Sequence, residues 1–178
     1  DAAAIDGYLA LVEKGDYVCA RLRAERAAAE LGGVEIAELI GSCVNVATLL
    51  EARSKAIRNA IEALKGKETS LGTSKGPRKG RVEALTDEGV AMVSKFVIGG
   101  EAKGEIRLTV KWSELSPRTE DDLASSGGWN PAGPDGGIAV AYLALGRHDP
   151  DAAATRLAEQ GRHPLYEHLA GRVSAMRN

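Results

Sequence analysis

The stretch "EIRLTVKWSELSP", residues 105–117, decides the fold class that we predict for this chain. In its first half, apolar residues alternate with polar or charged ones, which is the pattern of a β-strand with one buried face. We predict that the apolar side chains face inward. We also expect Trp112 to hold the end of the strand against the segment that follows, rather than to bind a ligand. The apolar positions are Ile106, Leu108, Val110 and Trp112.

The second half of the stretch predicts the start of a helix. Ser116 can cap a helix, Pro117 suits its first position, and acidic residues fill the first turn. We therefore expect Trp112 to pack against Leu115 and this helix.

Three further strands are predicted upstream. The segments "GRVEALT" (80–86) and "GVAMVSKFV" (89–97) are separated by a short acidic turn, and "KETSLGT" (67–73) is a weaker strand pattern. Four short strands are too few for a sandwich. They suit a small, strongly bent sheet or an SH3-like barrel, and we take the barrel, over residues 66–115, as the prediction.

Helices are predicted on both sides of these strands. In residues 1–65 apolar residues step by three and four, which predicts a helical hairpin packed on itself. Residues 116–178 predict C-terminal helices that pack with the N-terminal ones as one unit. They are interrupted by a flexible Gly- and Pro-rich loop at 125–137. The predicted fold class is α+β, with segments at 1–65, 66–115 and 116–178.

Composition excludes some classes of partner. The net charge of −2 gives no global attraction to nucleic acid or to an anionic membrane. No apolar run approaches the roughly 20 residues that span a bilayer, so we expect no membrane insertion by this segment. Because the chain begins at Asp1 without a methionine, we expect it to be a piece of a longer polypeptide.

The two cysteines cannot form a disulfide framework. Cys19 and Cys43 both lie among apolar or alanine positions of predicted helices, so we expect two buried free thiols. A single disulfide between them is the alternative.

The central segment resembles a known class of small domain. "GKETSLGTSKGPRKGRVEALTDEGVAMVSK" (66–95) and "GEIRLTVKWSELSP" (104–117) resemble the SH3-like or Sm-like barrels of uncharacterised multidomain bacterial proteins. Gly80, Asp87 and Val90 fall where that pattern places a glycine, an acidic turn and an apolar strand. The resemblance implies a small barrel flanked by helical regions. Since the second Sm signature is absent, it implies no binding residues.

Two similar segments of the chain resemble tetratricopeptide-like helix pairs. "YLALVEKGDYVCARLRAE" (8–25) and "YLALGRHDPDAAATRLAE" (142–159) share a tetrapeptide, a turn with Gly and Asp, and an alanine-rich helix. The resemblance covers one unit at each end of the chain.

Motifs that carry chemistry are missing from the sequence. The sequence contains no Gly-x-Ser-x-Gly motif and no Gly-x-x-x-x-Gly-Lys-Ser/Thr phosphate-loop motif. His163 and His168 are spaced wrongly for a shared helix face. We predict no catalytic residue, no metal site and no cofactor, and therefore no enzyme.

Charge distribution offers the main functional signal. Between residues 65 and 111 there are ten Lys or Arg against six Asp or Glu. This basic segment either complements the acidic helical flanks, which is the interpretation we favour, or binds a phosphate backbone. The candidate phosphate contacts are Lys75, Arg78, Lys79 and Arg81.

The sequence thus predicts a non-catalytic interaction or scaffolding module of a larger protein. Its partner is expected to be a protein, including the rest of its own polypeptide, and Trp129 in the 125–137 loop is the candidate contact. The alternative is nucleic-acid binding by the basic central segment. An exposed apolar patch would favour the first hypothesis, and unpaired basic residues on one open face would favour the second.

Overall fold

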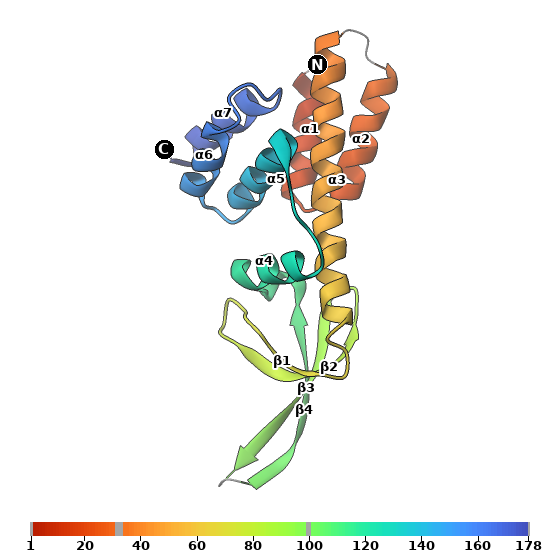
Figure 1. The fold of residues 1–178 in the computed structure, drawn as a ribbon, viewed down its shortest axis with the longest axis vertical. Coiled ribbons are helices and arrows are strands. Elements are labelled where there is room, and N and C mark those ends of the chain that lie inside the picture. The colour runs from red at the N-terminus through yellow and green to blue at the C-terminus, as the bar shows by residue number, and fades with distance from the viewer. Residues whose placement is uncertain (1, 31–33, 99–100, 178) are drawn as a thin grey trace. The chain divides into compact units, whose positions relative to one another are not determined.

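The structure is a computed structural model that describes residues 2–30, 34–98 and 101–177. For residues 2–4, 34–35, 96–98 and 101–103 it describes only the backbone. The described residues form seven α-helices, a four-stranded sheet and one 3₁₀ helix, which confirms the α+β class (Figure 1). The helices are α1 (Ala2–Glu13), α2 (Tyr17–Glu30), α3 (Val34–Glu62), α4 (Pro117–Ser126), α5 (Gly133–Gly146), α6 (Pro150–Ala158) and α7 (Tyr166–Arg177), and the 3₁₀ helix is η1 (Trp112–Glu114).

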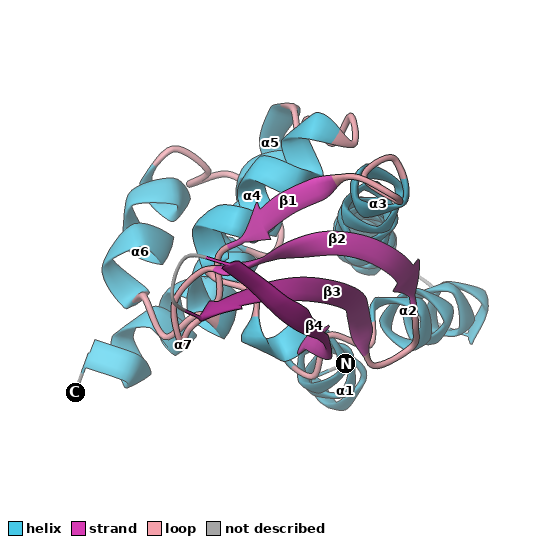
Figure 2. Cartoon of the chain, turned by 90° about the horizontal axis from the view of Figure 1, so that it is seen from below, coloured by secondary structure: helices cyan, strands magenta, loops and turns pink. Residues whose placement is uncertain are grey.

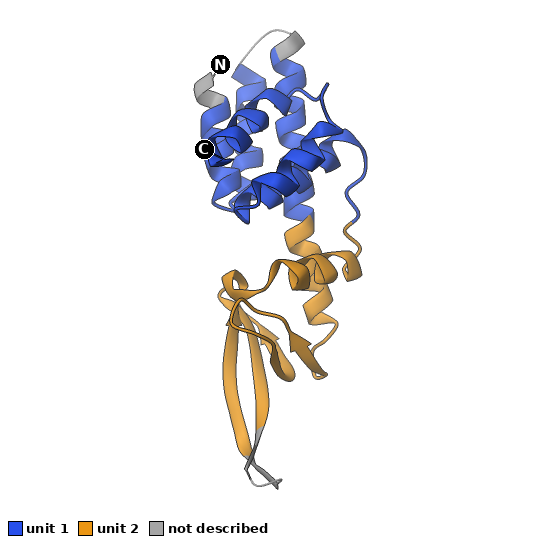
Figure 3. Cartoon of the chain, turned by 90° about the vertical axis from the view of Figure 1, so that its left-hand side faces the viewer, with its two compact units in different colours: residues 1–52, 130–178 blue, residues 53–129 orange. Residues whose placement is uncertain are grey.

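The chain divides into two compact units (Figure 3). A helical unit consists of residues 1–52 and 130–178, and a sheet unit consists of residues 53–129. The long helix α3 contributes to both, because the division falls between Ala52 and Arg53.

The helical unit is built around an apolar core from α1, α2, α3, α5, α6 and α7. Both copies of the Tyr-Leu-Ala-Leu tetrapeptide contribute to it, and Tyr8 and Tyr142 are buried. Each copy precedes a turn that ends in an aspartate N-cap. Asp16 accepts the Cys19 N–H at 3.1 Å, and Asp149 accepts the Ala152 N–H at 2.9 Å. The sequence echo thus corresponds to two helix pairs, α1–α2 and α5–α6.

The prediction of a flexible loop over residues 125–137 is wrong at both ends. Residues 125–126 close α4, and residues 133–137 open α5. Pro134 is compatible with the first turn of a helix, and Asp135 suits the positive end of its dipole. Asp135 also accepts from Asn45 Nδ2 at 3.0 Å and contacts His163 Nε2 at 2.8 Å, which ties the start of α5 to the core.

The prediction of two buried thiols is half wrong. Both cysteines are free, and Cys43 is buried, but Cys19 is exposed. The stripe that α2 buries runs through Ala20 and Ala24, four residues apart, so Cys19 lies off the buried side of the helix.

The sheet is antiparallel and open, in the order β1-β2-β3-β4 (Figure 2). The SH3-like barrel predicted for residues 66–115 is therefore wrong. β1 has only four residues, and the edge strands β1 and β4 do not pair; between the segments that follow them, the described residues form only the isolated bridge Thr73↔Leu115. The strands are β1 (Glu68–Leu71), β2 (Arg78–Leu85), β3 (Gly89–Ile98) and β4 (Glu101–Lys111).

The hairpin of β3 and β4 extends beyond the rest of the sheet (Figure 1). β2 pairs with β3 only as far as Arg81↔Val93, whereas β3 and β4 continue to Ile98↔Glu101. The predicted inward face is correct for Val110, which is buried, but wrong for Ile106, which is 53% exposed. Ile106 pairs with Ser94, one residue beyond the Arg81↔Val93 pair at which the ladder between β2 and β3 ends.

One face of the sheet packs against helices of the same unit. Its apolar side chains form a core with the last turns of α3 and with α4. The predicted cap of α4 is confirmed, because Ser116 Oγ accepts the Thr119 N–H at 3.3 Å and Pro117 begins the helix. Gly80 lies where two strands approach closely: a Cβ there would be 2.6 Å from the Val93 carbonyl oxygen.

Candidate functional site

The sheet face opposite α3 and α4 is charged, and we call it the outer face. Side chains alternate between the faces of a strand, so the residues on either side of the buried Val82, Met92 and Val110 belong to the outer face. Among the side chains that the structure describes on this face, five are basic and three are acidic. They are Lys79, Arg81, Lys95, Arg107 and Lys111, with Glu68, Glu83 and Glu105.

Register brings two arginines to the same level of the outer face. Val93 on β3 pairs with Arg81 on β2 and with Arg107 on β4. Both arginines are exposed, and Arg107 Nε lies 3.6 Å from Glu83 Oε2. Sequence reasoning missed Arg107 as a site residue, although its polar position in the alternation of residues 105–111 was a usable signal.

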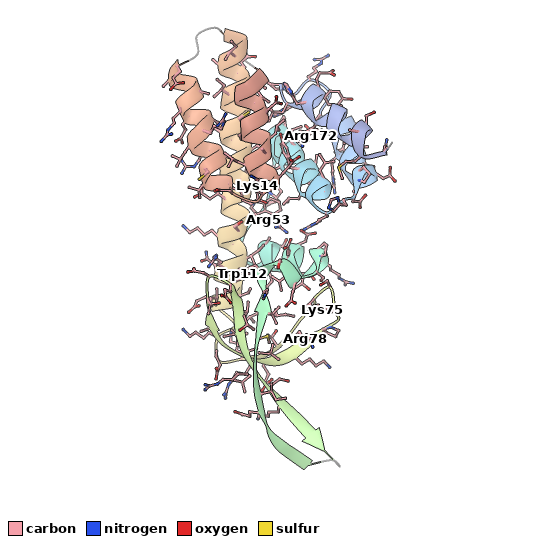
Figure 4. All side chains as sticks on the ribbon, turned by 180° about the vertical axis from the view of Figure 1, so that it is seen from behind. Lys14, Arg53, Lys75, Arg78, Trp112 and Arg172 are labelled. Carbon is pink, nitrogen blue, oxygen red and sulfur yellow. The ribbon has the colours of Figure 1, made fainter. Side chains whose placement is uncertain are left out.

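The four predicted phosphate contacts fall into different environments. Lys79 and Arg81 share the outer face, whereas Arg78 has the parity of the helix-covered face and is exposed because it begins the strand. Lys75 lies in the β1–β2 connection, near Arg78 (Figure 4). The structure therefore brings Lys79 and Arg81 together with Arg107, and it places Lys75 apart from them.

Lys75 forms an ion pair with a described residue. Its Nζ lies 2.9 Å from Glu114 Oε1, and this hydrogen bond, helped by the Lys111 N–H, lowers the pKa of Glu114. The turn that presents Lys75 is fixed by Thr73, whose hydroxyl donates to the Gly76 carbonyl at 2.6 Å. Arg78, Lys79 and Arg81 are exposed and form no ion pair with any residue that the structure describes.

Both tryptophans lie off the outer face and pack at the border of the core of the sheet unit. Trp112, labelled in Figure 4, is half-buried. Its Nε1–H donates to the Thr86 carbonyl at 3.2 Å, and the Arg58 guanidinium lies 4.9 Å from its ring centroid. The predicted packing of Trp112 at the end of the strand is therefore observed, with partial rather than full burial.

Trp129, the predicted partner contact, is half-buried and folded back onto the same core. The Arg53 guanidinium lies 5.7 Å from its ring centroid. Arg53 is itself buried and bridges two acids of α4, Glu120 at 3.1 Å and Asp121 at 2.9 Å. Arg53 thus links α3 to the acidic residues of α4 and to Trp129, which follows α4.

Burial displaces the pKa values of three titratable groups in the core of the helical unit. Burial raises the pKa of the Cys43 thiol to about 12 and raises the pKa of Tyr8 and Tyr142 above the ordinary value. Among the residues that the structure describes, no three His, Cys, Asp or Glu side chains gather where they could hold a metal ion.

Within the described ranges, no helix combines the length and the apolar composition needed to cross a membrane. No protein-family model, no curated protein and no solved structure matches this chain.

Proposed function

We propose that this chain is a non-catalytic interaction module, and that the outer face of its sheet binds the phosphate backbone of nucleic acid. The observation that carries the proposal is that Lys79 and Arg81, on this face, are exposed and form no ion pair with the described residues of their own unit. If this basic strand served to neutralise acidic residues of its own unit, these side chains would form ion pairs there, as Lys75 does with Glu114.

The chemistry of the outer face fits a phosphate backbone. Solvated guanidinium and ammonium groups attract phosphates, and releasing the counterions of the nucleic acid supplies the binding free energy. Arginine adds geometry, because its planar fork can donate two hydrogen bonds to one phosphate. Arg81 and Arg107, on either side of Val93, present two such forks from the same level of one sheet.

Other features of the face limit affinity and specificity. Glu68 lies opposite Arg81, and Glu105 lies opposite Lys95, so part of the positive field is cancelled. None of the outer-face side chains that the structure describes is aromatic, so bases have no stacking platform there. We expect binding that is weak, strongly dependent on salt and insensitive to base sequence.

The test is fluorescence anisotropy of labelled duplex and single-stranded oligonucleotides, titrated with the chain at several salt concentrations. We expect saturable binding at low salt. For the duplex, the slope of log K against log salt should be about −3, as expected for three or four neutralised phosphates. Replacing Lys79→Ala and Arg81→Ala together should weaken binding and reduce that slope by about 2.

The matched control removes two exposed lysine or arginine charges from the helical unit, Lys14→Ala with Arg162→Ala. It changes the net charge equally and should leave binding nearly unchanged. If the control weakens binding as much as the outer-face variant, the attraction is global and the outer face is not the site. If no oligonucleotide binds at low salt, the nucleic-acid ligand is wrong and the module must act on a protein.

A further inference from the structure

β4 is an edge strand whose free side carries unpaired backbone groups. Trp112 N–H donates to the Glu88 carbonyl at 3.2 Å, so residues 88 and 112 form a hydrogen-bonded pair. Such pairs alternate along an antiparallel ladder. Hence residues 106, 108 and 110 bond to β3, whereas residues 105, 107 and 109 direct their N–H and C=O groups to the free edge. No backbone group of a described residue bonds to them there.

The hairpin that contains this edge lacks support in its outer half. Beyond the Arg81↔Val93 pair, β3 and β4 form a ribbon of two strands, and such a ribbon alone is marginally stable in water. This half of the ribbon also exposes Ile106, one of the few large apolar side chains on the described surface. A further strand on the free side of β4 would satisfy the backbone groups and cover Ile106.

We infer that this strand is β4 of a second copy of the chain, paired antiparallel about a two-fold axis at Ile106. In this register Glu105 of each copy lies opposite Arg107 of the other, on the outer face. Ile106 lies opposite Ile106 on the other face. Both hydrogen-bonding residues of each new pair, 105 and 107, have their backbone groups directed to the free edge, so the ladder can form. The interface is isologous, as a closed dimer requires.

The neighbouring symmetric registers, with axes at residues 105, 107 and 108 or between two residues, are disfavoured by charge or by hydrogen bonding. An axis at residue 105 or 107 would place Glu105 opposite Glu105, or Arg107 opposite Arg107, and like charges directly opposite are destabilising. An axis at residue 108 would need the Lys111 N–H for a pair with Glu105, but that N–H already donates to Glu114 Oε2 at 3.4 Å. An axis between two residues would pair an outward-directed residue with an inward-directed one.

Pairing about Ile106 also leaves room for the elements that follow β4. It places Lys111 of one copy opposite residue 101 of the other, so the two Lys111 residues are about 30 Å apart along the strands at the usual rise per residue. The η1 and α4 segments of the two copies therefore begin at opposite ends of the paired strands. The contact is one strand wide, so we expect a weak dimer that forms at high concentration.

Cross-linking tests the register directly. Ile106 lies opposite itself at a non-hydrogen-bonded position, where the Cα atoms of an antiparallel pair are about 4.5 Å apart, within disulfide range. Ile106→Cys, made together with Cys19→Ser to remove the exposed native thiol, should give a disulfide-linked dimer on mild oxidation. Thr109→Cys in the same background is the control. It is exposed on the same edge, but its two copies would be about 20 Å apart in this register.

Charge exchange tests the pairing without a covalent bond. By sedimentation equilibrium without nucleic acid, the unaltered chain should show a concentration-dependent dimer. Glu105→Arg or Arg107→Glu alone should weaken it about tenfold or more, because each change creates two like-charge contacts. The double variant Glu105→Arg with Arg107→Glu should restore the dimer to within about threefold, although it removes the Arg107–Glu83 contact.

The outcomes decide the inference independently of the proposed function. Rapid Ile106→Cys cross-linking together with rescue by the double charge exchange supports the register. A chain that stays monomeric at several hundred micromolar, or cysteines at 106 that cross-link no faster than those at 109, overturns it. A dimer that forms but is not rescued by the charge exchange also overturns the register at Ile106.

Discussion

Replacing Trp112 by alanine is the sharpest test of how the sheet unit is held together. The side chain is half-buried at the border of the core, and its Nε1–H donates to the Thr86 carbonyl at 3.2 Å. It thereby joins the end of β4 to the turn between β2 and β3. The Arg58 guanidinium of α3 lies 4.9 Å from the ring centroid.

The expected cost is the sum of three contributions. An enclosed tryptophan buries about 150–250 Å², and half of that at about 25 cal/mol per Å² is worth about 2–3 kcal/mol. The hydrogen bond to Thr86 adds about 1 kcal/mol or less, since Thr86 is exposed and its carbonyl can be hydrated. The exposed cation–π contact with Arg58 adds about 0.5 kcal/mol. We expect Trp112→Ala to lower the free energy of unfolding of the sheet unit by about 3–4 kcal/mol.

The assay is urea denaturation followed by the fluorescence of Trp129, which lies in the same unit and remains in the variant. Trp112→Phe is the matched variant, because it keeps most of the apolar area and should lose only about 1 kcal/mol. If the free energy of unfolding of Trp112→Ala is within about 0.5 kcal/mol of that of the unaltered chain, Trp112 does not hold the end of β4 against the rest of the sheet unit. Equal losses of unfolding free energy in the alanine and phenylalanine variants would also contradict this role, since burial of the ring would then contribute nothing.

Two further predictions concern other parts of the chain. Gly80→Ala should destabilise the sheet unit, because its Cβ would lie 2.6 Å from the Val93 carbonyl oxygen. Gly41→Ala, at an open position of α3, should instead stabilise the chain by about 0.5–1 kcal/mol, because alanine favours the helix. Thermal unfolding of the two variants compares these effects. Burial raises the pKa of Cys43 in the folded chain from 9.0 to about 12, so the folded state holds the thiol proton more tightly than the unfolded state. The contribution of this thiol to the free energy of unfolding is therefore complete below pH 9 and is lost as the pH rises towards 12. Urea titrations from pH 7 to about 10.5 should show falling stability, with a shallower fall for Cys43→Ala.

Local sequence pattern accounts for much of the fold. Alternation in residues 105–111 predicted a strand with one apolar face, and Val110 is buried on that face as expected. Ser116 and Pro117 predicted the start of α4, because a cap depends on residues three positions apart. The basic residues Lys79 and Arg81 could be placed on one face for the same reason: side chains in a strand alternate.

Features that depend on pairing between distant segments were not predictable in this way. Arg107 lies at the level of Arg81 only because β3 pairs with both strands in a particular register. The exposure of Ile106 depends on where the pairing between β2 and β3 ends, at Arg81, about 25 residues earlier in the chain. Trp129 belongs to a Gly- and Pro-rich segment whose sequence left open whether the ring is exposed, and it folds back because α3 and α4 offer it a core.

The sequence by itself determined the elements of this protein: helices on both sides of four short strands, and the residues that begin α4. These follow from interactions within a few residues, where periodicity and capping operate. Only the tertiary structure decided that the sheet stays open, with β1 and β4 as separate edges. Closure depends on whether two strands about 35 residues apart meet, and no local pattern encodes that distance.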